Sequence, residues 1–157
     1  MDDQSNDLTI SRLIKAPRQV VWTAWTTPEH LQKWWCPKPW TTRIRRFDLR
    51  PGGAFDTLMT GPDGEESSNP GAFLEIVPQE RIVFTTALTE GWRPGTPWLS
   101  ITAIIVMKDE GNQTRYTARV LHKDAEDRRR HEELGFQDGW GTCIEQLGEL
   151  AQELAGS

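Results

Sequence analysis

An apolar stripe near the C-terminus limits the possible folds more than any other pattern in the sequence. Apolar residues recur there at steps of three and four, at Phe136, Trp140, Cys143, Ile144, Leu147, Leu150, Ala151 and Leu154. Such steps place the side chains on one face of a helix of about five turns. A helix with one apolar face must cover another apolar layer, and the rest of the chain must supply that layer.

The layer is supplied by short segments rich in β-branched and aromatic residues. Turn sequences such as GPDG and DEGN separate them and predict strands at 8–14, 42–49, 53–60, 71–77, 81–88, 98–107 and 113–121. Such short connections favour antiparallel neighbours. Residues 89–97 are polar and contain Gly and Pro, so we expect them to be the least ordered part of the chain.

Shorter helices are predicted on both sides of these strands. Pro17 suits the start of one helix, and Thr27-Pro28-Glu29 suits the start of a second, which should end near Trp35 because prolines follow. After the last strand, Asp124 can cap a helix that Gly135 terminates.

The order of elements predicts the fold class. One strand, two short helices, six strands and a long helix describe an α+β helix-grip fold, in which a curved antiparallel sheet wraps around the C-terminal helix. We expect one domain over residues 1–157, with a core at about 8–154.

Five segments, taken in order, resemble one known family. IKAPRQVVWTAWTTPEHLQKWW, FDLRPGGAF, GPDG, GAFLEIVPQERIVFT and HEELGFQDGWGTCIEQLGELA are similar to the homologues of the activator of the heat-shock-protein-90 ATPase, within the START-like (SRPBCC) superfamily. The resemblance extends from about Leu8 to Leu154 and implies the helix-grip fold. It also implies a choice of functions, since the superfamily includes lipid and steroid carriers, polyketide cyclases and chaperone activators.

Composition excludes several classes of function. A formal net charge of −5 argues against a nucleic-acid-binding protein. Cys36 and Cys143 have neither disulfide-framework nor metal-ligand spacing, so we expect no metal and no other cofactor. The N-terminus is acidic and polar, unlike a signal peptide, and no apolar run is long enough to span a membrane. We therefore expect a cytoplasmic protein.

Strand alternation predicts which side chains lie between the sheet and the long helix. They are mostly apolar with a few hydroxyls, which suits a pocket for a lipid, a sterol or an aromatic polyketide and suits an ordinary core equally. The candidate ligand-binding residues are Trp35, Phe55, Thr57, Phe84, Thr86, Tyr116, Trp140 and Ile144.

Aromatic residues and glycines bear on the choice between pocket and core. Trp34 and Trp35 point about 100° apart on a helix, so we expect one to anchor the core and the other to line the cavity mouth. Gly139 and Gly141 flank Trp140. They either allow close helix packing or leave space beside the indole ring.

A second hypothesis rests on charge. The segment from Arg12 to Arg50 contains nine basic residues but only two acidic ones, Glu29 and Asp48. This excess is either a solvated surface or a site for an acidic partner, for which the candidate residues are Arg43, Arg45 and Arg46.

An enzymatic function is the third hypothesis. The sequence contains no nucleophile or metallopeptidase motif. His122 is the candidate acid or base at the pocket edge, and Asp56 and Glu75 are either inward carboxylates or partners of cross-strand basic residues. The leading hypothesis is therefore a non-enzymatic helix-grip domain that binds a small hydrophobic molecule, with a chaperone-activator-like interaction module as the alternative. A cyclase or hydrolase is the remaining alternative.

Overall fold

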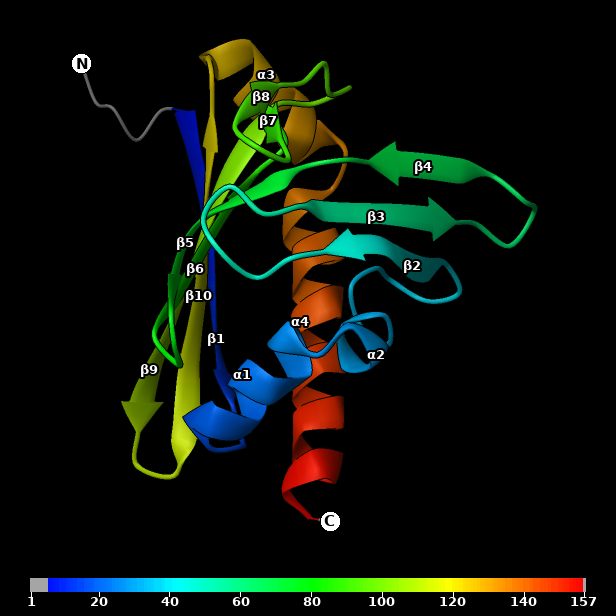
Figure 1. The fold of residues 1–157 in the computed structure, drawn as a ribbon. Helices are drawn as coiled ribbons and strands as arrows, with labels where there is room; N and C mark the ends of the chain where they lie inside the picture. Colours follow the sequence, from blue (N-terminus) through cyan, green and yellow to red (C-terminus); the bar gives the residue numbers. More distant parts are fainter. Residues whose placement is uncertain (1–5, 157) are drawn as a thin grey trace.

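A five-stranded antiparallel sheet forms one side of the molecule in the computed structural model, which describes residues 6–156 (Figure 1). Its order is β1-β10-β9-β6-β5, so the first and last strands of the chain lie side by side. The bounds are Asp7–Ile14 for β1, Ala72–Val77 for β5, Arg81–Thr85 for β6, Ile101–Glu110 for β9 and Gln113–His122 for β10.

A second, three-stranded sheet adjoins the first. It contains β2 (Thr41–Phe47), β3 (Phe55–Thr60) and β4 (Glu66–Asn69), and a single antiparallel bridge between Ala54 and Ala72 joins it to the larger sheet. Figure 1 shows α4 (Phe136–Ala155) running alongside the five-stranded sheet, with β2 and β3 crossing it in this view. The predicted α+β helix-grip fold is confirmed.

The helices are positioned as their sequences predict. The stripe of α4 is buried at Ile144, Leu147 and Ala151, and α4 packs against α1 (Arg18–Thr26) and β1. The Asp124 carboxylate accepts a 2.8 Å hydrogen bond from the backbone N–H of Asp127 and so caps α3, which spans Ala125–Glu133. Gly135 has φ 92°, a conformation that separates α3 from α4 at low cost only for glycine.

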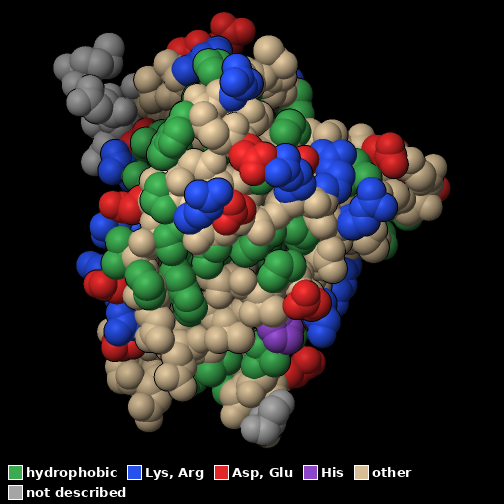
Figure 2. Space-filling view, in the orientation of Figure 1, with side chains coloured by type: hydrophobic (Ala, Val, Ile, Leu, Met, Phe, Trp, Pro, Cys, Tyr) green, Lys and Arg blue, Asp and Glu red, His purple; other side chains and the backbone are tan. Residues whose placement is uncertain are grey.

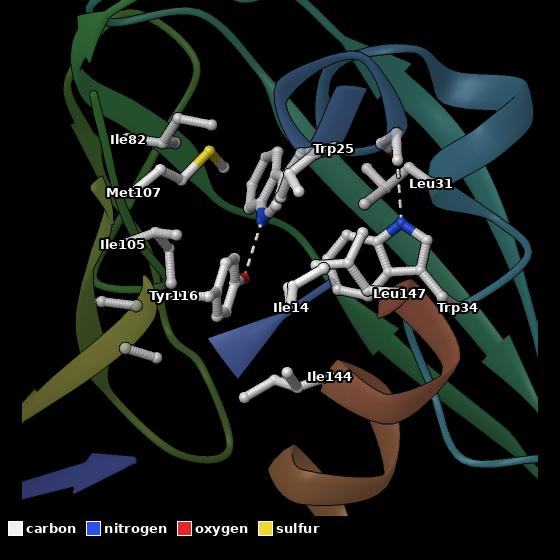
Figure 3. Close-up of a cluster of buried hydrophobic side chains, with 14 of the residues drawn as sticks. Ile14, Trp25, Leu31, Trp34, Ile82, Ile105, Met107, Tyr116, Ile144 and Leu147 are labelled. Atoms are coloured by element: carbon white, nitrogen blue, oxygen red, sulfur yellow. Dashed lines mark hydrogen bonds between the residues drawn. The ribbon is translucent and has the colours of Figure 1, made fainter. Parts of the chain in front are cut away.

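Buried aromatic residues between α1, the sheets and α4 form the centre of the core (Figure 3). The Trp25 indole donates a 3.0 Å hydrogen bond to the Tyr116 hydroxyl, and the Trp34 indole donates one of 3.0 Å to the Ala24 carbonyl. These bonds satisfy N–H groups whose burial would otherwise destabilise the fold.

The structure departs from the sequence prediction in three places. The second helix, α2 (Pro28–Leu31), is shorter than predicted, and turns continue it towards Trp35. Strand β4 was not predicted because both its faces are polar, which is tolerated at the edge of a sheet. The segment expected to be least ordered contributes to a small hairpin of β7 (Leu88–Thr89) and β8 (Arg93–Pro94).

No helix within residues 6–156 is both long and apolar enough to cross a lipid bilayer.

Candidate functional site: a cavity beneath the C-terminal helix

A cavity of about 390 Å³ lies between α4 and the two sheets. This volume falls within the range of small-molecule sites. Its wall comes from segments far apart in the chain, including the end of the α2 region, β3, β6, β10, α3 and α4. The structure brings all of the predicted ligand-site residues to this wall: Trp35, Phe55, Thr57, Phe84, Thr86, Tyr116, Trp140 and Ile144.

An aromatic cluster forms one side of the cavity. The Trp35 ring centroid lies 5.2 Å from that of Phe55 and 5.6 Å from that of Phe84. Trp34 is 2 % exposed and anchors the core, whereas Trp35 is only partly buried. The two adjacent tryptophans thus divide their roles, although both border the cavity.

The helical glycines differ in their surroundings. A Cβ atom on Gly141, which does not border the cavity, would lie 3.6 Å from Cδ1 of Ile10, an ordinary packing distance. A Cβ atom on Gly139, which lines the cavity, would meet nothing within 4 Å. Of the two alternatives left open for these glycines, free space applies at Gly139 and close packing applies at Gly141, which lies against β1.

Most hydroxyl groups around the cavity already have partners. The Thr86 hydroxyl donates to the Leu99 carbonyl and accepts from the Ile101 N–H, each at 2.9 Å, so it fixes the chain that leads into β9. The Tyr116 hydroxyl accepts from Trp25. The Thr57 hydroxyl, by contrast, has no hydrogen-bond partner within the described residues. The Thr57 hydroxyl can therefore form a further hydrogen bond more readily than that of Thr86 can.

Two exposed apolar side chains border the cavity on the solvent side. Trp98 is 52 % exposed and Leu134 is 61 % exposed. The Trp98 indole donates a 3.0 Å hydrogen bond to the Asn69 side-chain oxygen, and the Arg130 guanidinium lies 5.7 Å from the Trp98 ring centroid. Sequence analysis missed these two residues. Trp98 was placed at the start of a predicted strand but lies in a bend before β9, and Leu134 is the C-cap residue of α3, so neither lies on a regular strand or helix face.

Burial keeps the thiol and phenol groups on the cavity wall in their protonated forms. Desolvation raises the pKa of the Cys143 thiol to about 12, and raises the pKa of the Tyr116 phenol. Burial also raises the pKa of the Cys36 thiol, although a hydrogen bond donated by the Thr42 hydroxyl opposes this effect. Neutral thiols are weak nucleophiles and metal ligands. Among the described residues, no group of three His, Cys, Asp or Glu side chains could hold a metal ion.

A histidine pair replaces the single histidine expected at the pocket edge. His131, on α3, lines the cavity, whereas His122, at the end of β10, is 7 % exposed and lies outside the cavity wall. The 2.9 Å distance between Nε2 of His122 and Nδ1 of His131 is that of a hydrogen bond. His131 was not predicted because its sequence context, RRRHEE, is typical of a solvated helix.

The candidate inward carboxylates are surface partners of arginines. Asp56 pairs with Arg45 across β2 and β3 at 2.6 Å, and Glu75 pairs with Arg81 across β5 and β6. Neither carboxylate belongs to the cavity wall.

The basic surface around β2 is partly neutralised. Arg45 is bonded to Asp56 and Ser68, and Arg46 forms an ion pair with Glu90. Arg43 is exposed and makes no ion pair within the part of the chain that the structure describes. Figure 2 shows blue and red side chains intermixed on this face. A general anion-binding surface would need more unpaired positive charge than this.

Comparisons with known proteins agree with this architecture. The family described as Activator of Hsp90 ATPase homolog 1-like protein matches residues 15–152. A comparison with curated proteins finds no match.

Solved structures add bacterial relatives. A crystal structure from Nitrosomonas europaea is 41 % identical, with a TM-score of 0.93 and 100 % of both chains covered. One from Mycobacterium smegmatis is 27 % identical, with a TM-score of 0.80, covering 95 % of this chain and 92 % of that one. A Silicibacter pomeroyi structure, whose name also refers to this family, is 21 % identical with a TM-score of 0.68, covers 94 % of this chain and 99 % of its own, and supports the fold alone.

Proposed function

Because the chain belongs to the family of Activator of Hsp90 ATPase homolog 1-like proteins and encloses a cavity, we propose that it binds a small hydrophobic molecule there without transforming it. A lipid, a sterol or an aromatic polyketide has the required chemistry. The observation that carries the proposal is the cavity of about 390 Å³, with an aromatic wall and few free polar groups. Apolar walls with few polar groups are typical of ligand pockets.

The protonation states in the cavity support binding over catalysis. The raised pKa values of Cys143 and Tyr116 leave both groups neutral near pH 7, so neither supplies a ready nucleophile or base. The carboxylates Asp56 and Glu75 are engaged with arginines away from the cavity. A cyclase or hydrolase mechanism lacks an activated group among these residues.

Intrinsic tryptophan fluorescence tests the proposal, since Trp35, Trp98 and Trp140 border the cavity. Wild type is titrated with a fatty acid, a sterol and an aromatic polyketide, beside Trp140→Phe to isolate the signal of that ring. A saturable change with at least one ligand is expected. No change with any ligand, in protein shown to be folded by circular dichroism, would contradict the proposal.

A pair of substitutions at Gly139 locates the binding. Gly139→Leu fills the cavity, whereas Gly139→Ala gives nearly the same gain in helix propensity with a single methyl group. If the leucine side chain overlaps the ligand at a cost of about 1–3 kcal/mol, as in overpacked cores, the affinity of the Leu variant should fall by roughly 5- to 150-fold. Equal affinities of the two variants would place the ligand elsewhere.

The alternative is an interaction module that resembles chaperone activators and uses Arg43, Arg45 and Arg46. Exposed Arg43 is the residue that favours it, because the other two have intramolecular partners. Arg43→Glu is also the cleaner test, since Arg45→Glu would place two carboxylates side by side at Asp56. An acidic partner should bind Arg43→Glu more weakly and should be released by salt. Insensitivity to both would exclude the module.

A further inference from the structure

The histidine pair fixes which hydrogen atoms its rings carry. Nδ1 of His122 lies 2.7 Å from the backbone carbonyl oxygen of Asn6. A carbonyl can only accept, so Nδ1 of His122 must carry a hydrogen. In the neutral ring Nε2 then has a lone pair, and it accepts from Nδ1 of His131 at 2.9 Å. Neutral His131 is therefore protonated on Nδ1 and bare on Nε2.

His131 lines the cavity, and its bare nitrogen is not the one that faces His122. The two nitrogens of an imidazole ring point in widely different directions, so Nε2 points away from His122, which is not on the cavity wall. The His131 ring centroid lies 5.1 Å from that of Phe136 and 6.3 Å from that of Trp140, both cavity residues. Within residues 6–156, Nε2 has no hydrogen-bond donor.

The surroundings keep the His131 ring neutral. Burial, together with the charge that His122 can carry, lowers the pKa of His131 to about 4. The other titratable groups on the cavity wall are neutral as well. Burial raises the pKa values of Cys143, Cys36 and Tyr116 and so keeps these groups protonated. The Arg130 guanidinium is placed over the Trp98 ring at the solvent side.

We propose that Nε2 of His131 accepts a hydrogen bond from the ligand, and that the ligand is an apolar molecule with an alcohol or phenol hydroxyl at the end that meets α3. This inference rests on the proposed ligand-binding function. It favours hydroxylated molecules over ionised carboxylates, which have no hydrogen to donate and would place a negative charge against a lone pair.

Three naphthalene probes of similar size test the inference by calorimetry at pH 8. This pH lies far above the pKa of His131, so that ring is neutral. 2-Naphthol can donate a hydrogen bond, whereas 2-methoxynaphthalene and ionised 2-naphthoate cannot. Since a hydrogen bond contributes about 0.5–1.5 kcal/mol net, 2-naphthol should bind wild type roughly 2- to 10-fold more tightly than the ether. The carboxylate should bind most weakly.

His131→Phe keeps an aromatic ring but removes the acceptor, so the preference for 2-naphthol over the ether should disappear. An unchanged preference in this variant, or tighter binding of 2-naphthoate than of 2-naphthol by wild type, would overturn the inference. The wild-type comparison holds even if the variant does not fold.

The outcomes also separate the two proposals. Equal binding of 2-naphthol and the ether by wild type would leave ligand binding standing and refute the role of His131. Binding of none of the probes would count against the aromatic ligand class and this inference together.

Discussion

Replacement of Tyr116 by phenylalanine should destabilise the fold by about 1–3 kcal/mol, although it removes only one oxygen atom. Trp25 is 0 % exposed and its indole N–H donates to the Tyr116 hydroxyl at 3.0 Å. Without that oxygen the Trp25 N–H stays buried but has no acceptor. Folding then pays the full cost of removing this N–H from water. The loss is therefore larger than the net value of the bond itself.

Urea unfolding followed by circular dichroism measures this effect. With a slope of about 2 kcal/mol per molar urea, a loss of about 2 kcal/mol lowers the midpoint by roughly 1 M without changing the slope. Trp25→Phe and the double variant complete a double-mutant cycle. The double variant should be more stable than the sum of the two single effects predicts. A Tyr116→Phe midpoint equal to that of wild type would refute the argument.

The pH dependence gives an independent check. Burial raises the pKa of Tyr116 above its ordinary value of 10.0, so the folded state holds this proton more tightly than the unfolded state. The contribution of this proton to the free energy of unfolding is fully present below about pH 10. It is lost as the pH rises further, by about 1.4 kcal/mol per pH unit. Tyr116→Phe should lack this part of the slope. Because the sequence has one tyrosine, phenolate absorbance reports Tyr116 alone, and its appearance near pH 10 in folded protein would contradict the prediction.

Three further predictions concern other residues. Gly139→Ala should raise the free energy of unfolding by about 0.5–1 kcal/mol, because its methyl group meets nothing within 4 Å, whereas Gly135→Ala should lower it because φ there is 92°; equal urea midpoints would contradict this. Asp124→Ala should cost about 1 kcal/mol by removing the cap of α3, and an unchanged midpoint would refute the assignment. Cys36 and Cys143 should react slowly with a disulfide reagent at pH 8 until urea unfolds the chain, since burial raises both pKa values; rapid reaction in native protein would show the thiols to be accessible.

Periodicity predicts this fold well because each long element has one buried face. The apolar stripe of α4 and the alternation in β10 predict both the type of element and the direction in which its side chains point. Strand β4 has no apolar face, so its Glu-Ser-Ser-Asn sequence carries no such signal. Its position is set by pairing with β3, which is a tertiary interaction.

The candidate site could be predicted only where it follows from strand and helix faces. Phe84 and Ile144 come to the cavity wall for that reason. The partners of Thr86, in contrast, depend on how the chain enters β9, and the hydrogen bond between His122 and His131 joins two elements across a turn. Local sequence cannot specify these contacts, because each depends on the packing of a second segment.

Gly139 is a position where the shape of the cavity can change without any change in the packing of the core. The buried core at Trp25, Trp34 and Leu147 holds the elements together, while a Cβ atom at Gly139 would touch no other group. A single codon change there can reshape the binding volume without disturbing a strand register or a core contact. Lineages that share this architecture can therefore come to differ in the shape of this cavity by few mutational steps, so common descent alone does not fix its shape.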